Sequence, residues 1–109
     1  MQLVTTKWLF ERGGLHDARV LWSRHRGSSV EVGLDDEWAN ERGLSRPEKQ
    51  MAPGTMIISL ADVLAGDLSA IDGGWISEFE MDDGELRLIF CDRDPLTLAT
   101  NSVAWASAA

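Results

Sequence analysis

Apolar and polar residues alternate with a period of two along several stretches of this chain, which is the pattern of half-buried β-strands. The clearest pair of stretches, 75–81 and 86–91, flanks Asp83-Gly84, a dipeptide that favours a two-residue type I′ hairpin turn. The register set by this turn places Trp75 and three cross-strand pairs on the core face: Met81–Leu86, Phe79–Leu88 and Ser77–Phe90. The opposite face pairs Glu80 with Arg87, Glu78 with Ile89 and, at the turn, Asp82 with Glu85.

A second hairpin is predicted over residues 18–34. Residues 18–23 and 30–34 alternate in the same way, with Trp22 on the core face, and the sequence between them, 24–29, supplies a turn. Further strands are expected at Val4–Phe10 and Thr55–Ser59, where β-branched and aromatic residues are frequent.

Short helices are expected between and after these strands. Asp35 or Asp36 can cap a helix that ends near Glu41, and 45–48 has the spacing of a capping box around Pro47. The same spacing at 59–62 predicts a helix over 60–65. Asp94-Pro95 predicts a final helix through 103, although its threonines leave a terminal strand as an alternative, and 106–109 is expected to be frayed.

Together these elements predict an α+β fold. Residues 1–109 would form one small domain, a mostly antiparallel sheet of about four to six strands with two or three short helices. The single cysteine, Cys91, cannot form an internal disulfide and is expected to be a structural thiol within a strand. We expect a reduced, cytoplasmic protein, because no leader-like segment opens the sequence and no apolar run is long enough to span a bilayer.

Charge is distributed unevenly along the chain. Residues 1–29 carry 5 basic and 2 acidic side chains, whereas 30–109 carry 5 basic and 16 acidic ones, for a formal net charge of −8. A net negative charge disfavours direct binding to nucleic acid or to an anionic membrane, and it favours a basic protein as the partner. The alternative is that the acidic residues only keep the protein in solution.

The candidate partner-binding residues are the acidic ones that cluster near tryptophan or at the second hairpin: Asp35, Asp36, Glu37, Glu78, Glu80, Asp82, Asp83 and Glu85. A possible basic contact comprises Arg19, Arg24, His25 and Arg26. These basic side chains could instead offset acidic ones within the same molecule, or meet the acidic face of a second copy in a homodimer or larger assembly.

No motif for catalysis, nucleotide binding or a cofactor is present. His16, Asp17 and His25 could together form a two-histidine, one-carboxylate metal site, but their spacing does not favour it. We therefore predict neither catalytic residues, nor a metal, nor a cofactor.

The function predicted from the sequence is non-enzymatic protein binding. The acidic surface of a stoichiometric inhibitor would occlude the basic groove of a nuclease or another nucleic-acid-handling enzyme. In size and composition the chain is similar to bacterial toxin-immunity proteins and phage-encoded inhibitors, with no motif that assigns it to either. The alternatives are a small metal-dependent enzyme built on His16, Asp17 and His25, and a homo-oligomeric structural or regulatory module.

Overall fold

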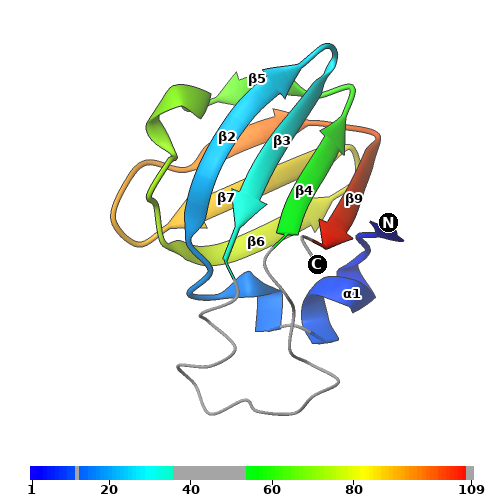
Figure 1. Ribbon diagram of the computed structural model, residues 1–109, viewed down its shortest axis with the longest axis horizontal. Helices are drawn as coiled ribbons and strands as arrows, with labels where there is room; N and C mark the ends of the chain where they lie inside the picture. The colour runs from blue at the N-terminus through cyan, green and yellow to red at the C-terminus, as the bar shows by residue number, and fades with distance from the viewer. Residues whose placement is uncertain (12, 36–53, 108–109) are drawn as a thin grey trace.

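The computed structural model describes residues 1–11, 13–35 and 54–107, and these residues form two antiparallel β-sheets (Figure 1). The strands of the first sheet, in spatial order, are β1 (Gln2–Leu3), β9 (Ser102–Ser107), β4 (Gly54–Ser59), β3 (Ser29–Leu34) and β2 (Val20–Arg26). Those of the second are β5 (Asp62–Ala65), β8 (Leu96–Ala99), β7 (Glu85–Phe90) and β6 (Ile76–Asp82). The α-helix α1 (Thr6–Glu11) and the short 3₁₀ helix η1 (Gly13–Leu15) lie between β1 and β2, and the 3₁₀ helix η3 (Leu68–Ala70) lies between β5 and β6.

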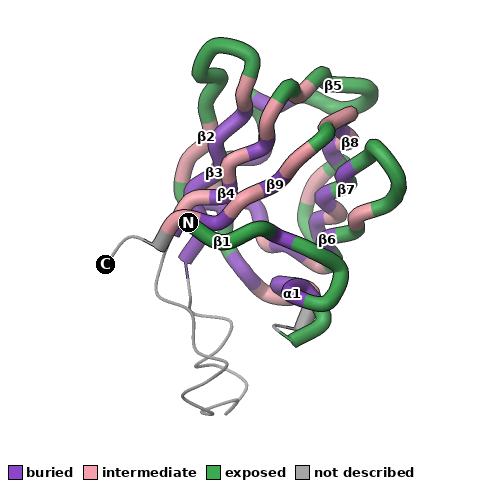
Figure 2. The backbone as a smooth tube through the Cα atoms, turned by 90° about the vertical axis from the view of Figure 1, so that its right-hand side faces the viewer, coloured by how far each residue is buried: buried purple, intermediate pink, exposed green. Residues whose placement is uncertain are grey.

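The core lies between the two sheets. Figure 1 shows one sheet in front of the other, and Figure 2 shows buried positions recurring along the strands of both. The buried apolar side chains of both sheets and of α1 belong to one hydrophobic cluster. Within it the rings of Trp8 and Trp105 lie 5.8 Å apart between centroids, so α1 covers one end of the first sheet. The described residues are therefore mostly β, with one short α-helix where the sequence predicts two or three.

The hairpin predicted around Asp83-Gly84 is confirmed as β6 and β7. Its register is the predicted one from Asp82–Glu85 to Glu78. Beyond Glu78 the pairing shifts at a β-bulge, and Phe90 faces Ile76 where the sequence predicts Ser77. A bulge adds one residue to one strand and redirects the side chains that precede it.

The turn of this hairpin differs from the predicted type. Gly84 has a φ of 74°, but Asp83 is not among the residues with positive φ. A type I′ turn needs positive φ at both positions, so the turn is not type I′. It nevertheless closes the predicted two-residue loop, because its glycine supplies the one left-handed position that the turn requires.

The predicted hairpin over 18–34 is confirmed as β2 and β3, and the strand at 55–59 as β4. The turn predicted over 24–29 is shorter than expected, because β2 runs through Arg26 and β3 begins at Ser29. The apolar side chains of β3, Val30, Val32 and Leu34, are buried as predicted, but Glu31 and Gly33 between them are buried too, so burial on β3 does not alternate. Trp22 and Trp75, predicted to be in the core, are only half-buried. The tryptophans that fill the core are Trp8 and Trp105.

The strand predicted at Val4–Phe10 is wrong, since residues 6–10 belong to α1. Thr5 caps the helix, because its Oγ1 accepts a hydrogen bond from the Trp8 backbone N–H at 3.1 Å. Trp8 and Leu9 face the core while Phe10 is exposed, so burial follows a helical stripe and not a period of two.

The helix predicted over 60–65 is also wrong: Asp62–Ala65 is β5, which pairs with β8. Ser59 does not act as a cap, because it ends β4 and its carbonyl accepts a hydrogen bond from Thr100 Oγ1 at 2.7 Å. Leu60 then reverses the chain with a φ of 51°. Pairing with β8 therefore outweighs the local capping signal.

The final predicted helix is replaced by β8 and β9, in line with the strand alternative, and the break lies at Thr100-Asn101. Buried Leu96, Leu98 and Val103 alternate with less buried residues, as in strands. Residues 106–107 of the tail expected to be frayed belong to β9, while 108–109 lie outside the described residues. The helix expected from Asp36 to Glu41 and the turn at 45–48 also lie outside them.

Candidate functional site

The outward side of the second sheet carries a row of acidic side chains. On β6, Glu78, Glu80 and Asp82 are exposed, whereas Phe79 between them is buried and Met81 is half-buried. Successive side chains of a strand point to opposite faces, so the three carboxylates share the solvent face. The sequence predicts this arrangement.

Neighbouring strands extend the row. Asp82 faces Glu85 on β7, Glu85 faces Ala99 on β8, and Ala99 faces Asp62 on β5. Paired residues of adjacent strands lie on the same face, so three carboxylates line up across four strands. We call the exposed carboxylates of this sheet the acidic face: Asp62, Glu78, Glu80, Asp82 and Glu85.

Asp62 is the member that the sequence does not reveal as a site residue. Its strand carries an apparent capping box, and only pairing with β8 brings Asp62 into line with Glu85. Asp83, which the sequence also nominates, lies exposed at the turn next to this face and donates its backbone N–H to Asp82 Oδ1 at 2.8 Å.

The acidic face has little internal compensation. Arg87, opposite Glu80, is the one basic side chain on β6 and β7, and with Glu80, Asp82 and Glu85 it lines a shallow depression of about 150 Å³. None of the ion pairs among the described residues includes a carboxylate of the acidic face. Like charges directly opposite each other destabilise a sheet, and Asp82 with Glu85 is such a pair. Fold stability alone therefore does not account for this distribution of charge.

Asp35 does not belong to this surface, which corrects the prediction. It is buried, with 8 % of its surface exposed, and its Oδ1 accepts a hydrogen bond from the Arg19 backbone N–H at 2.9 Å. Its own N–H bonds to the Arg19 carbonyl oxygen. Asp35 thus joins the end of β3 to the residue before β2, a structural role. The other two residues of the predicted cluster, Asp36 and Glu37, lie outside the described residues.

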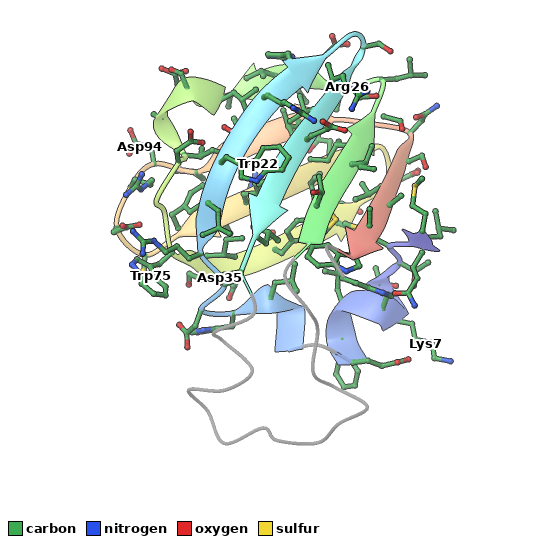
Figure 3. All side chains as sticks on the ribbon, viewed as in Figure 1. Lys7, Trp22, Arg26, Asp35, Trp75 and Asp94 are labelled. Atoms are coloured by element: carbon green, nitrogen blue, oxygen red, sulfur yellow. The ribbon has the colours of Figure 1, made fainter. Side chains whose placement is uncertain are left out.

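The basic tip of the β2–β3 hairpin is partly compensated within the hairpin, by one carboxylate for two arginines. Glu31, whose side chain is only 10 % exposed, accepts a hydrogen bond from Arg24 Nε at 2.6 Å and has Arg26 Nη1 at 3.8 Å. The Arg24 guanidinium also lies 5.1 Å from the centre of the Trp22 ring. Figure 3 shows Arg26 and Asp35 at opposite ends of this hairpin. Glu31 therefore offsets one of the two arginine charges within the hairpin.

The remaining basic candidates are Arg19, which precedes β2, and His25, which lies on β2 between Arg24 and Arg26. Arg19 packs over the Trp75 ring at 5.5 Å, and His25 is exposed on β2, beside an open depression that also contains Ser23 and Asp72. Ser23 Oγ donates to Asp72 Oδ1 at 2.6 Å.

The described residues do not assemble the alternative metal site. His16 Nδ1 lies 2.9 Å from Asp17 Oδ1, but in the described part of the chain no three His, Cys, Asp or Glu side chains come together as metal ligands. Cys91 is exposed and follows β7, where the sequence predicts a thiol within the strand, and its Sγ lies 3.6 Å from the Trp75 carbonyl oxygen.

Two carboxylates outside the acidic face have a pKa below the ordinary value of 3.8. The Ser69 hydroxyl and backbone N–H, donating to Asp67 at 2.7 and 2.9 Å, lower the pKa of Asp67. The Arg93 guanidinium does the same to the pKa of Asp92. Asp67 caps η3. Asp92 pairs with Arg93, whose Nη1 also donates a hydrogen bond to the Asp72 carbonyl oxygen.

Comparison with protein-family models, with curated proteins and with solved structures finds no match to this chain. Among the described residues, no helix has the length and apolar character needed to cross a membrane.

Proposed function

We propose that this protein is a non-enzymatic binding module whose acidic face docks onto a basic surface of another protein. The observation that carries the proposal is the row across the second sheet, where Asp62, Glu85 and Asp82 line up and Glu78 and Glu80 continue along β6. The carboxylates of this row are exposed, and Asp82 lies directly opposite the like-charged Glu85. On β6 and β7 only Arg87 carries a positive charge that offsets them.

The partner class follows from the geometry of the charges. Alternate residues of a strand are about 6.6 Å apart, so β6 presents a line of regularly spaced carboxylates on a rigid surface. A groove that binds nucleic acid presents lysine and arginine side chains to successive phosphates. The acidic face would engage those side chains and exclude the nucleic acid, which is the action of a stoichiometric inhibitor.

The experiment compares two charge-reversed variants as affinity baits. Glu78→Lys/Glu80→Lys changes the acidic face, and Glu11→Lys/Asp94→Lys changes exposed carboxylates outside it by the same amount of charge. Each bait is incubated with lysate of the source cell, and the retained proteins are quantified by mass spectrometry. Because both variants carry the same net charge, any difference between them reports on the location of the charge.

We expect the wild-type protein and the Glu11/Asp94 variant to retain the same basic, nucleic-acid-handling enzyme, and the Glu78/Glu80 variant to lose it. The purified enzyme should then release a fluorescent duplex when the wild-type protein is added in equimolar amount. Retention of the same partner by both variants, or a ternary complex with the duplex still bound, contradicts the proposal.

A further inference from the structure

Among the described residues, the outer edge of β6 has no neighbouring strand past Ile76. β6 is the terminal strand of its sheet, and the pair Asp82–Glu85 closes a two-residue turn. Hydrogen-bonded and non-hydrogen-bonded pairs alternate along an antiparallel ladder. Starting from the turn, Glu80 and Glu78 therefore bond to β7, whereas the N–H and C=O groups of Phe79 and Met81 point away from it.

The start of this edge is already used for strand-like pairing. The Ile76 N–H donates to the Ala18 carbonyl at 2.8 Å, and the Ile76 carbonyl accepts from the Asp17 N–H at the same distance. Past Ile76, no described strand continues this pairing. The edge is therefore capable of accepting a strand, and it is open over Phe79 and Met81.

Two depressions border the open edge. One, of about 280 Å³, lies between η1 and β6 and is lined by Gly14, His16 and Phe79 among others. The other, of about 300 Å³, has Leu3 and Val4 on one side and Met81 on the other. Figure 2 shows the N-terminal segment beside β6. The edge thus borders two partly apolar depressions, one beside η1 and one beside the N-terminal segment.

We propose that this edge accepts an extended segment of the basic partner as an added antiparallel strand, with basic and apolar side chains in alternation. The inference rests on the proposed function and specifies how the acidic face is engaged. Antiparallel pairing matches every other pairing in this sheet.

Charge selects this occupant over a second copy of the chain. Side chains of an added strand on the solvent face would lie beside Glu78, Glu80 and Asp82, where lysine or arginine gives favourable cross-strand pairs. Those on the other face would enter the two depressions next to Phe79 and Met81. Pairing of β6 with the β6 of a second copy would instead set carboxylates against carboxylates, the arrangement that protects natural sheet edges from self-association.

The test uses an acetylated and amidated peptide of four Lys-Val repeats. In antiparallel pairing, the valines lie opposite Phe79 and Met81 and supply the backbone hydrogen bonds, while the lysine amides point outward. N-methylation of the valine amides removes those donors without changing charge, and N-methylation of the lysine amides is the matched control. Affinity is measured by titration, and amide hydrogen exchange of the full-length protein is followed by NMR.

We expect the unmodified peptide to slow exchange of the Phe79 and Met81 amides at least tenfold, and to leave the already paired Glu78 and Glu80 amides unchanged. N-methylation at valine should abolish this protection, while N-methylation at lysine should preserve it. Failure of the peptide to bind at low salt overturns the inference. Binding without protection of Phe79 and Met81 also overturns it.

The outcomes separate the two proposals. If the partner enzyme binds and Glu78→Lys/Glu80→Lys weakens it, but the Phe79 and Met81 amides stay unprotected, the acidic face docks without strand addition and the proposed function stands. If the charge reversal leaves partner binding unchanged, the proposed function fails.

Discussion

Replacing Arg24 with alanine tests whether the charge of Arg24 is neutralised within the molecule by Glu31. Glu31 is nearly buried, and its carboxylate has Arg24 Nε at 2.6 Å and Arg26 Nη1 at 3.8 Å. A hydrogen bond to a charged group contributes about 1.5–3 kcal/mol. The Arg24 side chain is 55 % exposed, which places this pair between buried and surface cases, and we expect a coupling of about 1–2 kcal/mol. Loss of the stacking on Trp22 adds roughly 0.5 kcal/mol to the single-variant effect.

The assay is a double-mutant cycle by urea unfolding, followed by far-UV circular dichroism so that the signal does not depend on Trp22. Wild type, Arg24→Ala, Glu31→Ala and the double variant give the coupling free energy directly. A parallel cycle with Arg26→Ala is the control. Its longer distance and 70 % exposed side chain predict a coupling below about 0.5 kcal/mol. A coupling near zero for Arg24, or equal couplings for both arginines, would falsify the assignment of Arg24 as the partner of Glu31.

Three further predictions concern residues outside the acidic face. Asp35→Ala should lower the free energy of unfolding by about 1–3 kcal/mol in a urea titration, through loss of the bond from the Arg19 N–H, and should leave partner affinity unchanged. Asp67 has a lowered pKa, so its carboxylate stabilises the fold above pH 3.8 and loses this effect as the pH falls through the folded-state value. An acid titration of stability should therefore be less steep for Asp67→Asn than for wild type. Gly33→Ala would place a methyl carbon within the space of the Trp22 indole, so we expect a shift in tryptophan emission and a loss of stability.

Local signals in the sequence were sufficient to predict that the two hairpins form. Asp83-Gly84 fixes a two-residue turn, and alternation then determines which side chains of β6 and β7 are buried. The same two signals place Glu78, Glu80, Asp82 and Glu85 on one surface. Their prediction succeeds because turn and strands are contiguous in the chain.

The predictions that failed depended on contacts between distant parts of the chain. Residues 59–62 have the spacing of a capping box, yet residues 62–65 form a strand because they pair with β8. Burial of Asp35 depends on Arg19, sixteen residues earlier. Pairing of the N-terminal β1 with the last strand, β9, has no local signal at all. Asp62 joins the acidic face only through such long-range pairing.

The most direct test of the central claim is the association rate constant with the purified partner enzyme, measured by stopped flow over a series of salt concentrations. We expect Glu78→Lys/Glu80→Lys to lower this rate constant about tenfold at low salt and to flatten its dependence on salt, because the steering charges lie on the acidic face. Glu11→Lys/Asp94→Lys should remain close to wild type. Equal rate constants and equal salt dependence for the two variants would contradict the account.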